Sequence, residues 1–139
     1  MSLASGGIKI VRRRSAWYLS LAAAIAVPAV AHHNMSALFD FNQRFTKSGS
    51  LTDLDWRNPH IYMSVEVRNE DGEVETWSFE GPPPGFFRNR DFSRDDFEPS
   101  VGKTVPVEAS RARDGSMSGL IREVTLPDGR TVSACPQNC

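Results

Sequence analysis

The chain has 139 residues, which is the length of one ordinary domain. Its 40% hydrophobic and 24% charged residues are typical of a globular protein, and two cysteines are too few for a disulfide scaffold. The first 31 residues carry four basic side chains and no acid, so the remainder holds 12 basic against 17 acidic residues, a net charge of −5. An acidic body excludes nucleic acid as the expected partner, because phosphate binding needs clustered positive charge.

Residues 1–31 have the pattern of a secretory signal peptide. A basic segment at 9–14 precedes an apolar run at 16–30, which is shorter than the ~20 residues that span a bilayer. The run ends in Ala29-Val30-Ala31, a small-residue exit that favours cleavage after Ala31. We therefore expect export to the periplasm or the medium, with no stable membrane span after processing. An N-terminal membrane anchor is the alternative.

The rest of the chain predicts strands separated by turns. Asp-Gly pairs at 71–72, 114–115 and 128–129 are strong hairpin signals. Strands are expected at 45–56, 61–68, 74–80, 104–109, 120–126 and 131–132, and Gly49 allows the first of them to bend. One face of the second and third strands is apolar, which predicts a core containing Val65, Val67, Trp77 and Phe79 with Val105 and Val107 of the fourth.

A non-strand insert separates the third and fourth predicted strands. Three consecutive prolines at 82–84 cannot pair in a sheet, and Ser93 with Asp96 resembles a helix capping box. The order of elements predicts an all-β domain over 32–134, a small OB-like barrel of five or six strands with a short helical insert between strands 3 and 4. A split β-sandwich is the alternative, and residues 135–139 form a separate tail.

The hairpin formed by the predicted strands at 61–68 and 74–80 can be assigned a register. Keeping its apolar residues on one face, with Gly72 in a left-handed position of a three-residue loop, makes paired residue numbers sum to 142. Tyr62 then lies opposite Glu80 on the outer face. His60 becomes a diagonal neighbour of Glu80, within reach of its carboxylate. The outer face of an OB barrel is where such folds bind ligands.

Several short motifs together resemble a family of small exported bacterial proteins classified only as a domain of unknown function. The motifs are Ala31-His32-His33, Trp56-Arg57-Asn58-Pro59-His60, Trp77-Ser78-Phe79-Glu80-Gly81 and Thr125-Leu126-Pro127-Asp128-Gly129. The resemblance implies export and an all-β fold, and it brings no established activity. The chain departs from the family pattern at Asn34-Met35 and in the tail at 135–139.

The three histidines, His32, His33 and His60, are candidate metal ligands. Cleavage after Ala31 would free the amine of His32, and an amine with imidazoles is a nitrogen donor set that suits copper(II). Glu80 would orient the His60 ring or add a ligand. The residues between His33 and a first strand at Phe45 give the slack for the terminus to fold back. In the simpler interpretation the His-His pair is a solvated terminus and His60 only hydrogen-bonds within its turn.

Sulfur is the second candidate donor. Met35 and Met63 carry soft thioethers, but Met63 lies on the inward face and is expected in the core. Cys135 and Cys139 are predicted to form a disulfide in an exported protein, and a dithiol copper or redox site is the alternative.

These residues predict an exported copper-binding module. A metal-free module that binds a small ligand or an envelope protein through the face around Tyr62 and Glu80 is the alternative, and an enzyme ranks lowest.

Overall fold

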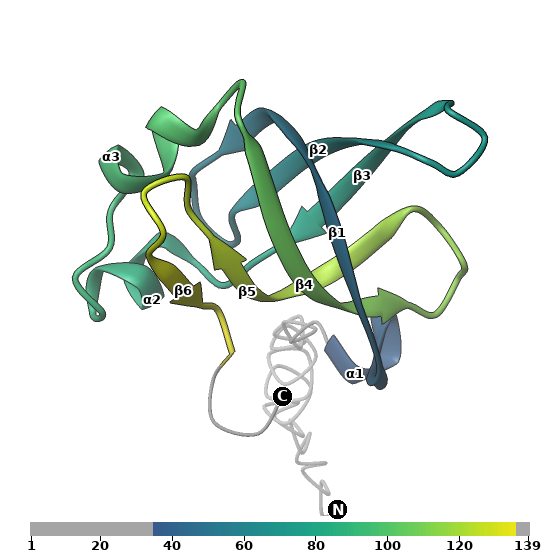
Figure 1. Ribbon diagram of the computed structural model, residues 1–139. Helices are drawn as coiled ribbons and strands as arrows, with labels where there is room; N and C mark the ends of the chain where they lie inside the picture. The colour runs from purple at the N-terminus through teal and green to yellow at the C-terminus, as the bar shows by residue number, and fades with distance from the viewer. Residues whose placement is uncertain (1–34, 136–139) are drawn as a thin grey trace, which may run out of the picture. The chain divides into compact units, whose positions relative to one another are not determined.

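The computed structural model describes residues 35–135, so the predicted signal peptide at 1–31 lies outside the described residues. A four-residue helix, α1 (Met35–Leu38), leads into β1 (Phe39–Asp55). The remaining elements follow in the order β2 (Tyr62–Arg68), β3 (Val74–Glu80), α2 (Pro84–Arg88), α3 (Arg94–Phe97), η1 (Glu98–Ser100), β4 (Thr104–Ala112), β5 (Ser118–Thr125) and β6 (Thr131–Ser133) (Figure 1).

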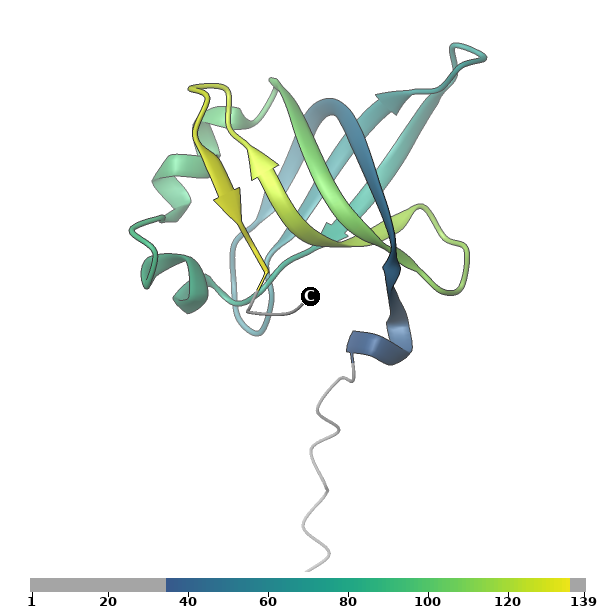
Figure 2. The same ribbon diagram turned by 60° about the horizontal axis from the view of Figure 1, so that its bottom comes forward.

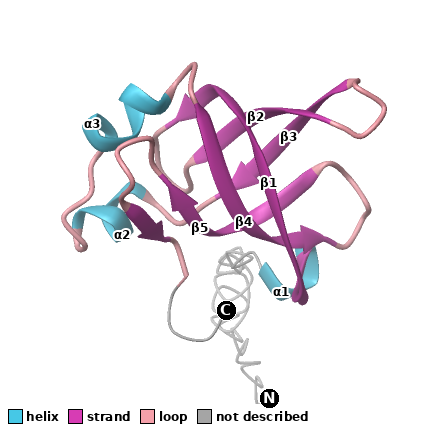
Figure 3. Cartoon of the chain, viewed as in Figure 1, coloured by secondary structure: helices cyan, strands magenta, loops and turns pink. Residues whose placement is uncertain are grey.

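Five strands form a hydrogen-bonded ring. The sheet order is β3-β2-β1-β4-β5-β6, and an additional parallel pairing between β3 and β5 closes it (Figure 3). The ring β1-β2-β3-β5-β4 has the strand connectivity of an OB-fold, and the helical insert lies between β3 and β4. The predicted all-β, barrel-like fold is therefore confirmed.

β1 is long because it serves two neighbours. Its first part pairs with β4 and its last part with β2, and Ser50 pairs with both Thr104 and Glu66. The bend at this point depends on Gly49, since a Cβ there would lie 2.1 Å from the carbonyl oxygen of Glu66. The strand begins at Phe39, earlier than the predicted start at Phe45. The sequence does not reveal this early start, because an irregularity between Asp40 and Arg44 breaks the alternation that marks a strand.

The β2–β3 hairpin has the predicted register. Tyr62 pairs with Glu80 and Val65 with Trp77. The backbone N–H of Asn69 donates to Glu73, which leaves residues 70–72 as the loop, with Gly72 at φ 84°. The hairpin therefore places its apolar side chains in the core and Tyr62 and Glu80 on the outer face.

The core fills the ring and continues into the helical insert. All six side chains that the sequence predicted for it, including Trp77, are buried in one cluster. Phe87 of α2 and Phe97 of α3 are fully buried and join the same cluster. Figure 1 shows that the insert covers one end of the ring, away from the projecting β2–β3 and β4–β5 hairpins. The predicted capping box at Ser93 and Asp96 starts α3.

Candidate functional site

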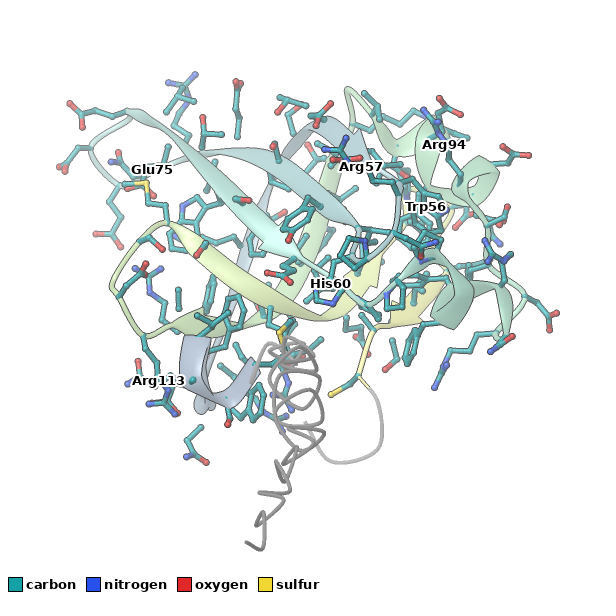
Figure 4. All side chains as sticks on the ribbon, turned by 180° about the vertical axis from the view of Figure 1, so that it is seen from behind. Trp56, Arg57, His60, Glu75, Arg94 and Arg113 are labelled. Carbon is teal, nitrogen blue, oxygen red and sulfur yellow. The ribbon has the colours of Figure 1, made fainter. Side chains whose placement is uncertain are left out.

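The β1–β2 connection, residues 56–61, reaches two different places. The Trp56 ring packs 5.1 Å from Phe87 and 5.0 Å from Phe97, so the start of the connection is anchored in the helical insert. His60, at its other end, lies next to the end of β3 (Figure 4). The neighbouring Ile61 is fully buried and hydrogen-bonds to Gly81. The connection that carries His60 is therefore held by the Trp56 ring at its start and by the backbone of Ile61 at its end.

His60 and Glu80 form a direct side-chain contact. Nδ1 of the imidazole meets Oε1 of the carboxylate, and the two side chains are only 22% and 16% exposed. An ionised carboxylate can only accept a hydrogen bond, so Nδ1 is the donor and neutral His60 keeps its lone pair on Nε2. This carboxylate–imidazole pair is the arrangement that orients metal-binding histidines in proteins. The diagonal contact predicted from the register is confirmed.

Tyr62 completes the cluster on the outer face. Burial raises the pKa of its hydroxyl above the ordinary 10.0, and the charge of Glu80, a hydrogen bond to Glu80 and the charge of Asp55 raise it further. Its hydroxyl therefore lies near the carboxylate that contacts His60, and the Tyr62 side chain is 39% exposed.

A cavity of about 170 Å³ lies beside this cluster, and His60 is one of its walls. Met35, the first described residue, is another wall, so the segment that enters β1 lies close to His60. The remaining lining is mostly apolar and comprises Gly81, Pro82, Pro83, Leu120, Ile121 and Ala134. Figure 2 shows that α1 and the described end of the chain after β6 lie on the same side of the strand ring. The cavity thus gathers both ends of the described chain.

The structure brings together only part of the predicted metal site. His60, Glu80 and Tyr62 form one cluster, whereas His32 and His33 lie outside the described residues. Within residues 35–135, no three His, Cys, Asp or Glu side chains are placed to hold a metal ion. A metal at His60 would therefore need donors from residues outside 35–135, or donors of another type.

The two methionine candidates lie in different parts of the fold. Met63 is fully buried in the core, as expected, whereas Met35 lines the His60 cavity. The sequence identifies the Met35 thioether as a candidate donor but does not predict that it lies beside His60. That position depends on α1, a helix too short to give a periodic signal. Cys135 follows the cavity residue Ala134, and Cys139 lies outside the described residues, so the disulfide stays a prediction.

In a second polar site, at the far end of the insert, the charged side chains pair with one another. Arg130 bridges Asp96 and Asp128 at 2.9 and 2.7 Å. These hydrogen bonds, with those from Ser93 to Asp96 and from the Arg130 backbone to Asp128, hold the pKa of both carboxyls below the ordinary 3.8. The network ties the turn before β6 to α3, and both of its carboxylates already have donors.

The geometry defines a small β-ring protein with a partly buried His60–Glu80 pair, flanked by the exposed Tyr62, at the edge of an apolar cavity. Residues 21–122 match a family model described as a family of unknown function (DUF6152), and the chain belongs to that family. The match includes the whole cluster and ends before Cys135. No curated protein and no solved structure matches the chain. Among residues 35–135 there is no helix with the length and apolar character needed to cross a membrane.

Proposed function

We propose that this protein is an exported copper-binding module whose site consists of His60 and the processed N-terminus. The observation that carries the proposal is the cavity shared by His60 and Met35. His32 is three residues before Met35, and three residues span up to ~11 Å of extended chain. The proposal requires that the amine and imidazole of His32, or the imidazole of His33, reach His60 across this span.

The contacts of His60 support a role as ligand. Glu80 engages Nδ1, which leaves Nε2 as the nitrogen for a metal ion. An amine and two imidazoles make a nitrogen set in a planar arrangement, which suits copper(II) better than zinc. The start of β1 at Phe39 leaves less slack than a start at Phe45, but α1 already directs the chain toward His60.

Copper titration of four proteins tests the proposal. They are the chain beginning at His32, the same chain with one added N-terminal residue, His60→Ala and His33→Ala. We expect the added residue and His60→Ala each to weaken copper(II) binding at least about tenfold, the scale of a lost interaction at a metal site, and His33→Ala to do less. Equal affinity for all four proteins would overturn the proposal. Circular dichroism and thermal midpoints check that each variant is folded.

The site of cleavage decides which amine is used. Intact mass of the exported protein would distinguish a chain starting at His32 from one starting at Ala31. With Ala31 first, histidine is the second and third residue, and the His33 imidazole joins the chelate instead. In that case His33→Ala, rather than His60→Ala, should cause the larger loss. Retention of residues 1–31 in the exported protein would contradict both versions.

The apolar cavity favours a second candidate, a metal-free module that binds a small apolar ligand or an envelope protein. Its volume of about 170 Å³ and its lining of prolines, leucine and isoleucine would suit a small apolar group. Protein isolated from its native export route, with intact processing, separates the two candidates. Bound copper supports the first, and an organic ligand without metal supports the second.

A further inference from the structure

Met35 lies at the His60 cavity and not in the hydrophobic core. Its side chain is half-buried and forms a wall of the His60 cavity. The two other methionines of the described chain differ from it, since Met63 is fully buried in the core and Met117 is 48% exposed on the β4–β5 loop. Met35 is therefore the thioether that the fold brings to the histidine.

The chemistry of this pair differs from that of an all-nitrogen site. A thioether is a soft ligand, and soft ligands select copper(I), whereas carboxylate and water ligands favour harder ions. The other walls, Pro82, Pro83, Leu120 and Ile121, supply few polar atoms. Such a lining offers an ion few hard oxygen ligands, which leaves the thioether as the distinctive donor beside His60.

We propose that the Met35 sulfur and His60 Nε2 bind cuprous copper at this cavity, an inference that rests on the copper-binding role proposed above. The ion arrives already reduced, so no electron donor is required. His60 binds copper in both oxidation states, and Met35 binds copper(I). The exported module would then accept copper in either oxidation state.

A ligand role for Met35 can be separated from a packing role. Leucine has nearly the same volume and apolar character as methionine but no sulfur, so Met35→Leu removes the donor and keeps the wall. Met117→Leu makes the same change on an exposed loop and is the matched control. The double variant Cys135→Ser/Cys139→Ser removes the thiols of the tail, the first of which follows the cavity residue Ala134.

Copper(I) affinity is measured anaerobically by competition with a chromogenic chelator, and copper(II) affinity separately, on the chain beginning at His32. We expect Met35→Leu to weaken copper(I) binding at least about tenfold while its copper(II) affinity changes less than about threefold. Met117→Leu should leave both affinities unchanged. X-ray absorption should show a copper–sulfur distance in wild type and in the double serine variant, and none in Met35→Leu.

Each other outcome overturns the inference in a recognisable way. If copper(II) binds tightly and Met35→Leu binds copper(I) as well as wild type does, Met35 is only a wall and the copper proposal stands. If the copper–sulfur signal disappears in the double serine variant, the tail thiols are the ligands instead. If wild type binds neither ion, the proposed function fails together with this inference.

Discussion

Trp56 and His60 lie four residues apart in one connection, and the regions they enter differ in nearly every respect. We call the aromatic residues Trp56, Phe86, Phe87, Phe92 and Phe97 the cap, and His60, Tyr62 and Glu80 the polar cluster. The rings of the cap contact one another at centroid distances of 5.0 to 6.4 Å, and two of them are completely buried. In the polar cluster, His60 and Glu80 are partly buried and in direct contact, whereas Tyr62 is 39% exposed.

This difference separates stability from function. Burial of large aromatic rings contributes several kcal/mol per side chain, whereas ion pairs near the surface contribute about 0–1 kcal/mol. The polar cluster can therefore change with little effect on folding, while the cap holds in place the connection that carries His60. Five predictions follow, from the largest expected effect to the smallest.

Phe97→Ala should lower the free energy of unfolding by about 3–5 kcal/mol, since Phe97 is fully buried against Trp56 and Phe87. Urea denaturation measures the loss. The partly buried Phe92 provides a comparison within the same cap, and Phe92→Ala should cost less. A midpoint equal to that of wild type would show that the cap does not carry the stability assigned to it.

Gly81→Ala should cost about 1–3 kcal/mol, the usual cost of overpacking. Gly81 lies between the two regions, and an added Cβ would lie 2.8 Å from Cγ1 of the buried Ile61 and 3.2 Å from Ile121. Gly85→Ala is the matched control, because its Cβ would meet nothing closer than 3.5 Å in α2, where alanine is favoured by about 0.5–1 kcal/mol. Opposite signs are expected, and two equal effects would show that the packing around Gly81 is not tight.

Glu80→Gln should change the free energy of unfolding by less than about 1 kcal/mol but return the pKa of Tyr62 toward 10.0. Removing the charge and weakening the hydrogen bond are the physical reasons. Tyr62 is the one tyrosine in a chain beginning at His32, so the absorbance of tyrosinate reports it alone.

The raised pKa of Tyr62 also sets the sign of a stability change. Its contribution is fully present below the unfolded value of 10.0 and is lost as the pH rises through the higher folded value. Tyr62→Phe should therefore flatten the alkaline end of the stability profile. An unchanged alkaline profile in Tyr62→Phe would place the titration elsewhere.

Asp96→Asn should have the smallest effect, because the pair it makes with Arg130 lies near the surface. The pKa of Asp96 is held below 3.8 first by hydrogen bonds from the Ser93 backbone, then by Arg130 and the Ser93 side chain. Its contribution is therefore present above pH 3.8 and is lost as the pH falls through the lower folded value. Thermal midpoints of wild type and variant should converge in acid, and a constant difference down to low pH would contradict this assignment.

Much of the polar cluster could be predicted because strand periodicity is local. An apolar alternation on both strands of one hairpin, together with Gly72, is enough to pair Tyr62 with Glu80. The diagonal contact with His60 follows from that pairing. The helical insert was also predictable, since consecutive prolines and a capping box have meanings that depend little on the rest of the fold.

Features that depend on distant parts of the chain could not be predicted. The early start of β1 is hidden by an irregular stretch, and its pairing with β4 joins residues more than fifty positions apart. The place of Met35 beside His60 depends on the position of α1 at a cavity that is also lined by Leu120, Ile121 and Ala134. Neither α1 nor these contacts carry a pattern that can be read along the sequence.

The parallel seam between β3 and β5 has a consequence for how the site is assembled. Only three residue pairs close the ring, and the last of them joins Glu80 to Leu120, forty positions later in the chain. A nascent chain that ends at β4 contains His60 and Glu80 but lacks the walls formed by Leu120, Ile121 and Ala134. Such long-range closure is slow to form and comes after local hairpins. The complete pocket is thus a property of the finished fold, so an unfinished chain offers an incoming ion or ligand a histidine without its enclosure.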